Sequence, residues 1–248
     1  KIFLDGSPQG RTAWMRTPYT GDAGEYGYGT MKDEDVRAAF DEAAKRKIQL
    51  LAHCNGDAAA AQMIRCLAEE EKKYPVLREL KPVMIHAQLL GKDQIPEAVS
   101  LGIIASFFAA HVYHWGDIHI KNFGMKRAAQ ISPAATAMKT GLPFTFHQDS
   151  PVIQPDMLET IWCAVNRKTK KGILLGEDER IPAYDALKAV TVNAAYQYSE
   201  EKVKGSLAAG KKADLVILDH DPLTAEPDDI RSIKVLETIK NGSTIYRS

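Results

Sequence analysis

The chain has 248 residues, of which 45% are hydrophobic and 26% are charged, and its formal net charge is zero. This composition is typical of a soluble globular protein with one large domain or two smaller ones. The balanced charge gives no sign of a nucleic-acid partner, and no apolar run approaches the roughly 20 residues that a membrane span needs. Three cysteines without metal-type spacing argue against a disulfide framework, so we expect a cytoplasmic protein.

Short apolar runs alternate with helix-like stretches through the first 150 residues. Thr30 is placed to cap the first helix, and glycines 102 and 141 follow two others, where glycine commonly ends a helix. Runs that are apolar throughout indicate parallel strands buried on both faces, in either a (β/α) barrel or a doubly wound sheet. The expected strands are KIFLD (1–5), IQLLAH (48–53), PVMIHA (82–87), IIASFF (103–108) and PFTF (143–146), and the expected helices are 30–47, 58–73, 94–101 and 131–140.

The last hundred residues change in character. Helices are predicted over 156–168, where Asp156 and Glu159 have the spacing of a capping box, and over 183–198. Then come the strand ADLVILD (213–219) and two short apolar runs on either side of Asn241-Gly242, a dipeptide typical of hairpins. We therefore expect an α/β region over residues 1–200 and an all-β region over residues 201–248.

Histidines gather where the predicted strands end, and in a barrel the loops after these ends build the active site. Imidazole is a common ligand of zinc, and a carboxylate near such an ion can carry a proton from water to a leaving group. Asp149 is therefore either a proton carrier or the cap of the turn at Ser150-Pro151. Each strand-end histidine is either a ligand or a hydrogen-bonded structural residue, and His111 and His114 fall in a presumed loop. The five are His53, His86, His111, His114 and His147.

Several short motifs follow one another along the chain in a specific order and spacing: KIFLDGSPQGRTA (1–13), LLAHCNGD (50–57), MIHAQLL (84–90), FFAAHVYHWGD (107–117), FTFHQDSPV (144–152), AVNRKT (164–169) and KGSLAAGKKADLVILDHDPL (204–223) with ETIKNGSTIY (237–246). Together they resemble the metal-dependent amidohydrolase superfamily, in the branch of YtcJ-like proteins, N-substituted formamide deformylases and AepA-like regulators. The resemblance covers essentially the whole chain and implies a partial (β/α)₈ TIM barrel, strands four to eight, followed by a C-terminal β-sandwich segment.

The resemblance also implies a set of site residues. One or two divalent ions, expected to be zinc, would be bound by Lys1 in carboxylated form, His53, His86 and Asp149, and Asp149 would be the catalytic proton carrier. His147 would orient that carboxylate or line the pocket. Substrate contacts are expected from His111, His114, His147, Arg11, Asn166 and Arg167, although the last three are equally well read as surface or inter-helix contacts.

The family's His-x-His pair has no counterpart before Lys1, so we expect a C-terminal fragment that is inactive alone. Homo-oligomerisation or association with the missing N-terminal half would cover its open edges. The expected reaction is hydrolysis of an amide-like, non-peptide C–N bond in a small-molecule substrate. Two alternatives stay open: a non-catalytic regulatory or binding protein on the same scaffold, and a deaminase, although residues 53–57 lack the glutamate that the superfamily's deaminases use.

Overall fold

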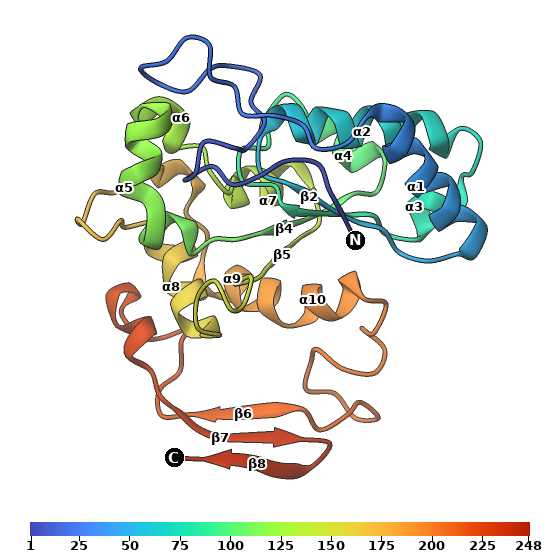
Figure 1. Ribbon diagram of the computed structural model, residues 1–248. Helices are drawn as coiled ribbons and strands as arrows, with labels where there is room; N and C mark the ends of the chain where they lie inside the picture. Colours follow the sequence, from blue (N-terminus) through green and yellow to red (C-terminus); the bar gives the residue numbers. More distant parts are fainter.

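The structure is a computed structural model that describes all residues from 1 to 248, and it contains a parallel and an antiparallel sheet (Figure 1). The parallel sheet has the strand order β1-β2-β3-β4-β5, so each strand pairs with the next one along the chain. This order lacks the reversal that defines a doubly wound sheet. All five predicted strands are confirmed, and their bounds are β1 Ile2–Phe3, β2 Leu51–Cys54, β3 Val83–His86, β4 Ile104–Phe107 and β5 Phe144–Phe146.

Helices connect these strands and continue beyond β5. Two sequence expectations about the helices that precede β5 are wrong. Thr30 does not cap the first helix, because its hydroxyl donates to the Phe3 carbonyl and the helix begins at Asp33. The histidine-rich stretch after β4 is a helix rather than a loop. The helices are α1 Asp33–Arg46, α2 Asp57–Glu71, α3 Val76–Glu79, α4 Ile95–Ser100, α5 His111–Phe123, α6 Met125–Ala128, α7 Ala134–Thr140, α8 Met157–Asn166, α9 Ala183–Val190 and α10 Val192–Gln197, with a 3₁₀ turn η1 at Glu177–Glu179.

The last predicted helix is divided into two. Thr191, with φ −124° and ψ −93°, breaks the expected 183–198 helix into α9 and α10. The predicted cap of α8 is confirmed, since the Asp156 carboxylate accepts a hydrogen bond from the Glu159 backbone N–H at 3.0 Å. In Figure 1, α8, α9 and α10 lie between β5 and the antiparallel sheet.

The main hydrophobic core lies between the parallel sheet and its helices and contains 41 buried residues, among them Phe40, Met84 and Phe107. Because side chains alternate across a strand, the opposite face carries a second, smaller apolar cluster of Val83, Ile85 and Ile104. Both faces of the central strands are therefore apolar, which explains the continuous apolar runs in the sequence.

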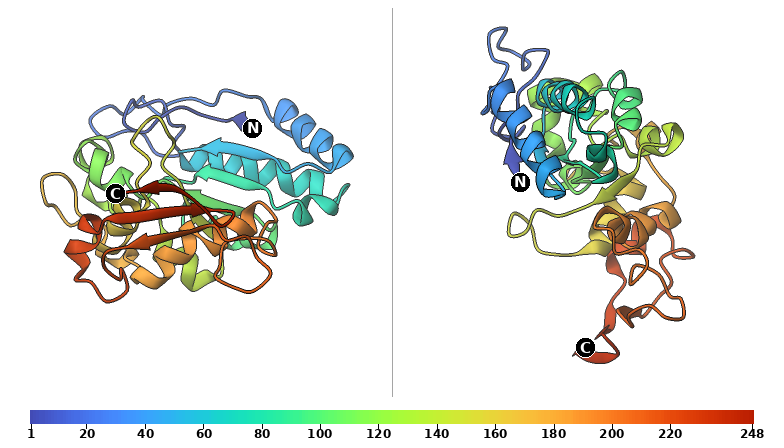
Figure 2. Two further views of the ribbon diagram at one scale, coloured as in Figure 1. Left: turned by 90° about the horizontal axis from the view of Figure 1, so that it is seen from below. Right: turned by 90° about the vertical axis from the view of Figure 1, so that its right-hand side faces the viewer.

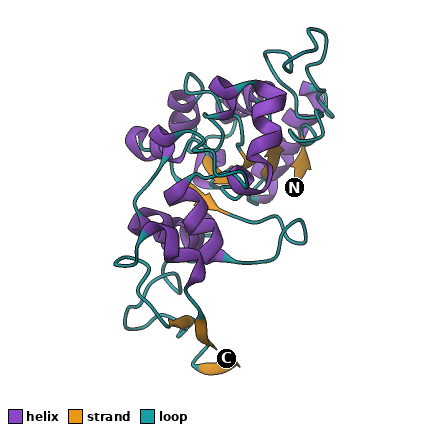
Figure 3. Ribbon diagram, turned by 90° about the vertical axis from the view of Figure 1, so that its left-hand side faces the viewer, coloured by secondary structure: helices purple, strands orange, loops and turns teal.

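The antiparallel sheet consists of β6 Leu215–Leu218, β7 Val235–Lys240 and β8 Ser243–Arg247, in that order. The β7–β8 turn places Asn241 and Gly242 at φ 49° and 80°, the left-handed conformation that tight hairpins need. The 3₁₀ helix η2, Pro227–Ser232, packs against α8, and the sheet projects away from the helices (Figures 2 and 3). No helix has both the length and the hydropathy required to cross a membrane.

Candidate metal centre

The carboxyl ends of the parallel strands bring together polar side chains on the face opposite the main core. His53 and His147 lie on this face, as alternation from the core residues Ala52 and Phe146 requires. The same alternation would place His86 with Met84, against the helices. Instead its backbone has φ +70°, a left-handed conformation that ends the strand, and its ring lies beside those of His53 and His147.

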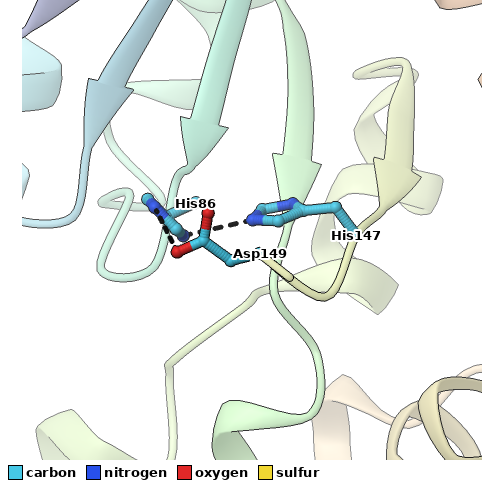
Figure 4. Close-up of side chains that lie close together, drawn as sticks. All are labelled: His86, His147 and Asp149. Carbon is cyan, nitrogen blue, oxygen red and sulfur yellow. Dashed lines mark hydrogen bonds and ion pairs between the residues drawn. The ribbon is translucent and has the colours of Figure 1, made fainter. Parts of the chain in front are cut away.

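Three side chains converge closely enough to hold one ion. His86, His147 and Asp149 each offer a ligand atom, and these atoms all lie within 4.8 Å of one another. His86 Nδ1 is 3.2 Å from His147 Nε2, and His86 Nε2 is 4.0 Å from the Asp149 carboxylate. The side chains point toward one another from the ends of β3 and β5 (Figure 4). Two imidazoles and one carboxylate are a donor set suited to a divalent ion such as zinc.

Burial keeps the clustered imidazoles neutral. It lowers the pKa of His86 far below the ordinary value, with further contributions from the neighbouring His147 and His53 rings. Burial also lowers the pKa of His147 to about 3, and the positive charge of Lys1 acts in the same direction. A histidine must be unprotonated to bind a metal ion, so both rings have the required protonation state at neutral pH.

His53 and Lys1 extend the cluster on the β1 side. The ring centroid of His53 lies 4.5 Å from that of His86, and its Nδ1 lies 3.2 Å from the carboxylate of Asp5. Lys1 is exposed, and its ammonium lies 4.9 Å from the centre of the Phe3 ring, which in turn packs against His53. Lys1 is thus on the same side of the sheet as the histidines.

The two histidines of α5 have different surroundings. His111 is buried, and its Nδ1 lies 3.0 Å from Nε2 of His119. The ring of Phe108 separates it from the cluster, with centroid distances of 4.6 Å to His111 and 5.3 Å to His147. His114 is partly exposed, and its Nε2 lies 2.8 Å from the Glu159 carboxylate.

Three expected substrate contacts are instead occupied within the fold. Arg11 donates to the side chain of Asn122 and to a backbone carbonyl. Asn166 donates to the carbonyls of Trp162 and Pro227. Arg167 is only 1% exposed, and its guanidinium donates to backbone carbonyls in 129–132 and at Leu175. All three side chains therefore make hydrogen bonds within the chain, in line with the packing alternative, and their contact with a substrate stays a prediction.

Sequence reasoning gave His147 only a substrate or orienting role, whereas the structure places it among the possible ligands. Alternation from Asp149 could have indicated this, since the two side chains are two residues apart. Asp5 and Ser106 were missed altogether. The Ser106 hydroxyl lies 3.0 Å from Nδ1 of His147, and Ser106 is the only polar residue of β4, whose sequence is IASF.

Fold and site together define an α/β protein with a histidine–carboxylate cluster at the carboxyl ends of parallel strands. Residues 1–246 match the profile of the amidohydrolase family, and the chain belongs to this family. The amidohydrolase YtcJ of Bacillus subtilis (strain 168) is 28% identical over 252 residues, which covers 99% of this chain and 46% of that protein. The N-substituted formamide deformylase of Arthrobacter pascens is 29% identical, covering 65% of this chain and 30% of that protein.

A solved structure supports the same relationship. A metal-dependent hydrolase from Pyrococcus horikoshii has a TM-score of 0.79 and 26% identity, and the match covers 91% of this chain and 45% of that one. The expected resemblance to this amidohydrolase branch is confirmed. The chain spans less than half the length of each of these relatives.

Proposed function

We propose that the protein is a metal-dependent hydrolase of amide-like, non-peptide C–N bonds in small molecules. The observation that carries the proposal is the convergence of His86, His147 and Asp149 within 4.8 Å at the strand ends, with the His53 ring beside them. Membership of the amidohydrolase family and the similarity to a formamide deformylase support the bond type. We further propose that the five parallel strands are strands four to eight of a (β/α)₈ barrel within residues 1–200, and that residues 201–248 belong to a β-sandwich.

His53, His86, His147 and Asp149 would hold one or two divalent ions, with zinc the proposed metal and carboxylated Lys1 a further ligand. A bound ion would make a water molecule more acidic and polarise a carbonyl group. The neutral, buried imidazoles fit this role because they offer lone pairs without needing to lose a proton. The Ser106 hydroxyl fixes the His147 ring by a hydrogen bond at Nδ1.

Asp149 is placed to move the proton. Its side chain is 37% exposed, so it borders both the buried histidines and the open side of the site. A carboxylate in this position can accept a proton from water and deliver it to the leaving nitrogen. His114, paired with Glu159, and His111, on the far side of Phe108, are kept as the proposed substrate contacts.

The test compares two neighbouring carboxylates in the intact protein. Asp149→Asn should reduce turnover of N-substituted formamides by ~10²–10⁴-fold, the usual contribution of a general acid–base group. Its metal content should be nearly unchanged, because the histidines remain. Asp156→Asn is the matched control, since the amide oxygen can still cap α8. Metal analysis and rate measurements on both variants decide the assignment.

Three results would contradict parts of the proposal. Full activity in Asp149→Asn would exclude Asp149 as the proton carrier. A metal-free intact protein that hydrolyses no amide would favour the regulatory or binding alternative. Release of ammonia from a ring amidine, without turnover of any amide, would favour the deaminase alternative.

A further inference from the structure

Asp5 is a buried carboxylate beside the candidate metal centre, just beyond the end of β1. Its side chain has no exposed surface, and His53 is its only ionisable partner. Three backbone N–H groups donate to it: Trp14 at 3.1 Å, Asn55 at 2.9 Å and Gly56 at 2.7 Å. Burying a carboxylate is unfavourable unless such donors replace water. Gly56 also precedes α2, a 15-residue helix whose amino end favours a negative charge.

These contacts fix the carboxylate in one orientation. Oδ2 accepts from Trp14 and Gly56, while Oδ1 accepts from Asn55 and lies 3.2 Å from Nδ1 of His53. Because two separate backbone segments, at Trp14 and at Asn55-Gly56, hold the two oxygens, the group facing His53 is rigid. A rigid acceptor next to one ring nitrogen determines both the tilt of the imidazole and the position of its proton.

The contacts of the other ring nitrogen, Nε2, independently indicate that the proton of His53 is on Nδ1. Nε2 of His53 lies 3.3 Å from Nδ2 of Asn55, which also lies 2.8 Å from the Gly6 carbonyl oxygen. A carbonyl oxygen only accepts, so the Asn55 atom facing Gly6 must be the amide nitrogen. The same nitrogen faces Nε2, which must then be the unprotonated acceptor. The Asp5 carboxylate and the Gly6 carbonyl therefore both place the proton of His53 on Nδ1.

We propose that Asp5 is a positioning residue that keeps the proton of His53 on Nδ1 and so reserves the Nε2 lone pair for a metal ion. This inference rests on the proposed function, in which His53 is a ligand. Carboxylates that accept the second N–H of a ligating histidine orient the ring and increase its basicity. When an ion takes the lone pair, Asn55 keeps its hydrogen bond to Gly6.

The experiment exchanges Asp5 for its amide in the intact protein. In Asp5→Asn the amide oxygen should remain with the Trp14 and Gly56 donors, which turns the amide nitrogen toward Nδ1 of His53. That nitrogen donates, so the ring proton should move to Nε2. Nitrogen-15 NMR of the histidine rings, recorded after chelation of metal ions, reports the tautomer directly. Zinc affinity, measured by competition with a chromophoric chelator, should fall 10–100-fold.

Thr12→Val is the matched control. It removes the hydrogen bonds of Thr12 to the backbone of Ser7 in the same loop without touching His53. A purely structural role for Asp5 predicts that both variants lose thermal stability and keep the wild-type tautomer and zinc affinity, and this result would overturn the proposal. If Asp5→Asn does not fold, the wild type still decides, since a proton on Nε2 of its His53 contradicts the assignment.

The two proposals can fail separately. If the wild type binds no zinc but Asp5→Asn still moves the proton of His53, the positioning by Asp5 is supported and the proposed function is wrong. If the wild type binds zinc and hydrolyses amides while Asp5→Asn changes neither the tautomer nor the affinity, the proposed function stands and the positioning role is wrong.

Discussion

The paired rings of His111 and His119 on α5 make the stability of the protein dependent on pH. The rings stack at a centroid distance of 5.3 Å and an angle of 7°. His119 is fully buried, and its Nδ1 has no hydrogen-bond partner. Burial lowers the pKa of His119 from 6.5 to about 3, so the ring is neutral in the folded state throughout the range in which a free histidine becomes charged.

The sign follows from the lowered pKa. Below pH 6.5 the unfolded chain binds a proton at His119 that the folded chain does not, so acidification favours unfolding. The stability is fully present above pH 6.5 and is lost as the pH falls toward 3. With these two pKa values, one such histidine reduces the free energy of unfolding by ~1.4 kcal/mol between pH 7.5 and pH 5.5. Because His111 is also buried and has a lowered pKa, the wild type should lose more than this.

His119→Phe removes the titrating group and keeps an aromatic ring in the stack with Phe123. Urea unfolding of wild type and variant at pH 7.5 and pH 5.5 measures the effect. The variant should lose ~1.4 kcal/mol less than the wild type between the two pH values. The control is His220→Asn, which removes a histidine whose side chain is 75% exposed and lies far from the buried pair, so it should not reproduce the effect of His119→Phe. Equal losses in wild type and His119→Phe would refute the reasoning.

Two further predictions concern packing. Arg167→Met leaves several buried carbonyl groups without donors and should destabilise the protein by about 3 kcal/mol in urea unfolding, with Arg167→Lys intermediate and metal content unaffected in both. A neutral effect would show that these hydrogen bonds do not stabilise the fold. Gly56→Ala would bring a Cβ to 1.8 Å from the Trp14 carbonyl oxygen, so the backbone must shift and the free energy of unfolding should fall by about 1–3 kcal/mol. Gly242→Ala, the control, meets no atom within 4 Å, and its positive φ alone should lower the free energy of unfolding by about 1 kcal/mol. Equal costs would show that the approach of Trp14 is not what requires glycine at position 56.

The strands could be predicted because their signal is local. The runs ending in His53 and His86 are short, apolar throughout and separated by helix-length segments, and few other structures satisfy that pattern. Helix α5 could not be predicted in the same way. Its sequence HVYHWGDIHIKNF contains Gly116 and several aromatic and β-branched residues of modest helix propensity. The burial of residues such as Val112 and His119 stabilises this helix, and that burial depends on tertiary packing.

The site was predictable in its residue types but less so in its geometry. Strand-end histidines and Asp149 indicated a metal site, and strict alternation correctly places His53 and His147 on one face. For His86 alternation gives the opposite face, because no local pattern announces that its backbone turns left-handed. Asp5 was missed for another reason: its partners are backbone N–H groups from two distant segments, and the sequence does not reveal which carboxylate will accept from them.

The backbone at the cluster has two residues with positive φ, which bears on the proposed metal site. Several residues with positive φ have local explanations, such as Lys47 and Arg167 at helix carboxyl ends and Asn241 in a hairpin. His86 and Asp149 end no helix and form no tight hairpin, yet have φ values of 70° and 49°. Asp149 also opens the turn at Ser150-Pro151, where its carbonyl accepts a hydrogen bond from the Val152 N–H at 2.9 Å. Such conformations cost of order 1–3 kcal/mol each and persist where surrounding contacts impose them. In both residues the unusual backbone turns the side chain toward the same point, where the rings are also buried in neutral form. A cation bound at that point, as proposed above, would compensate for both.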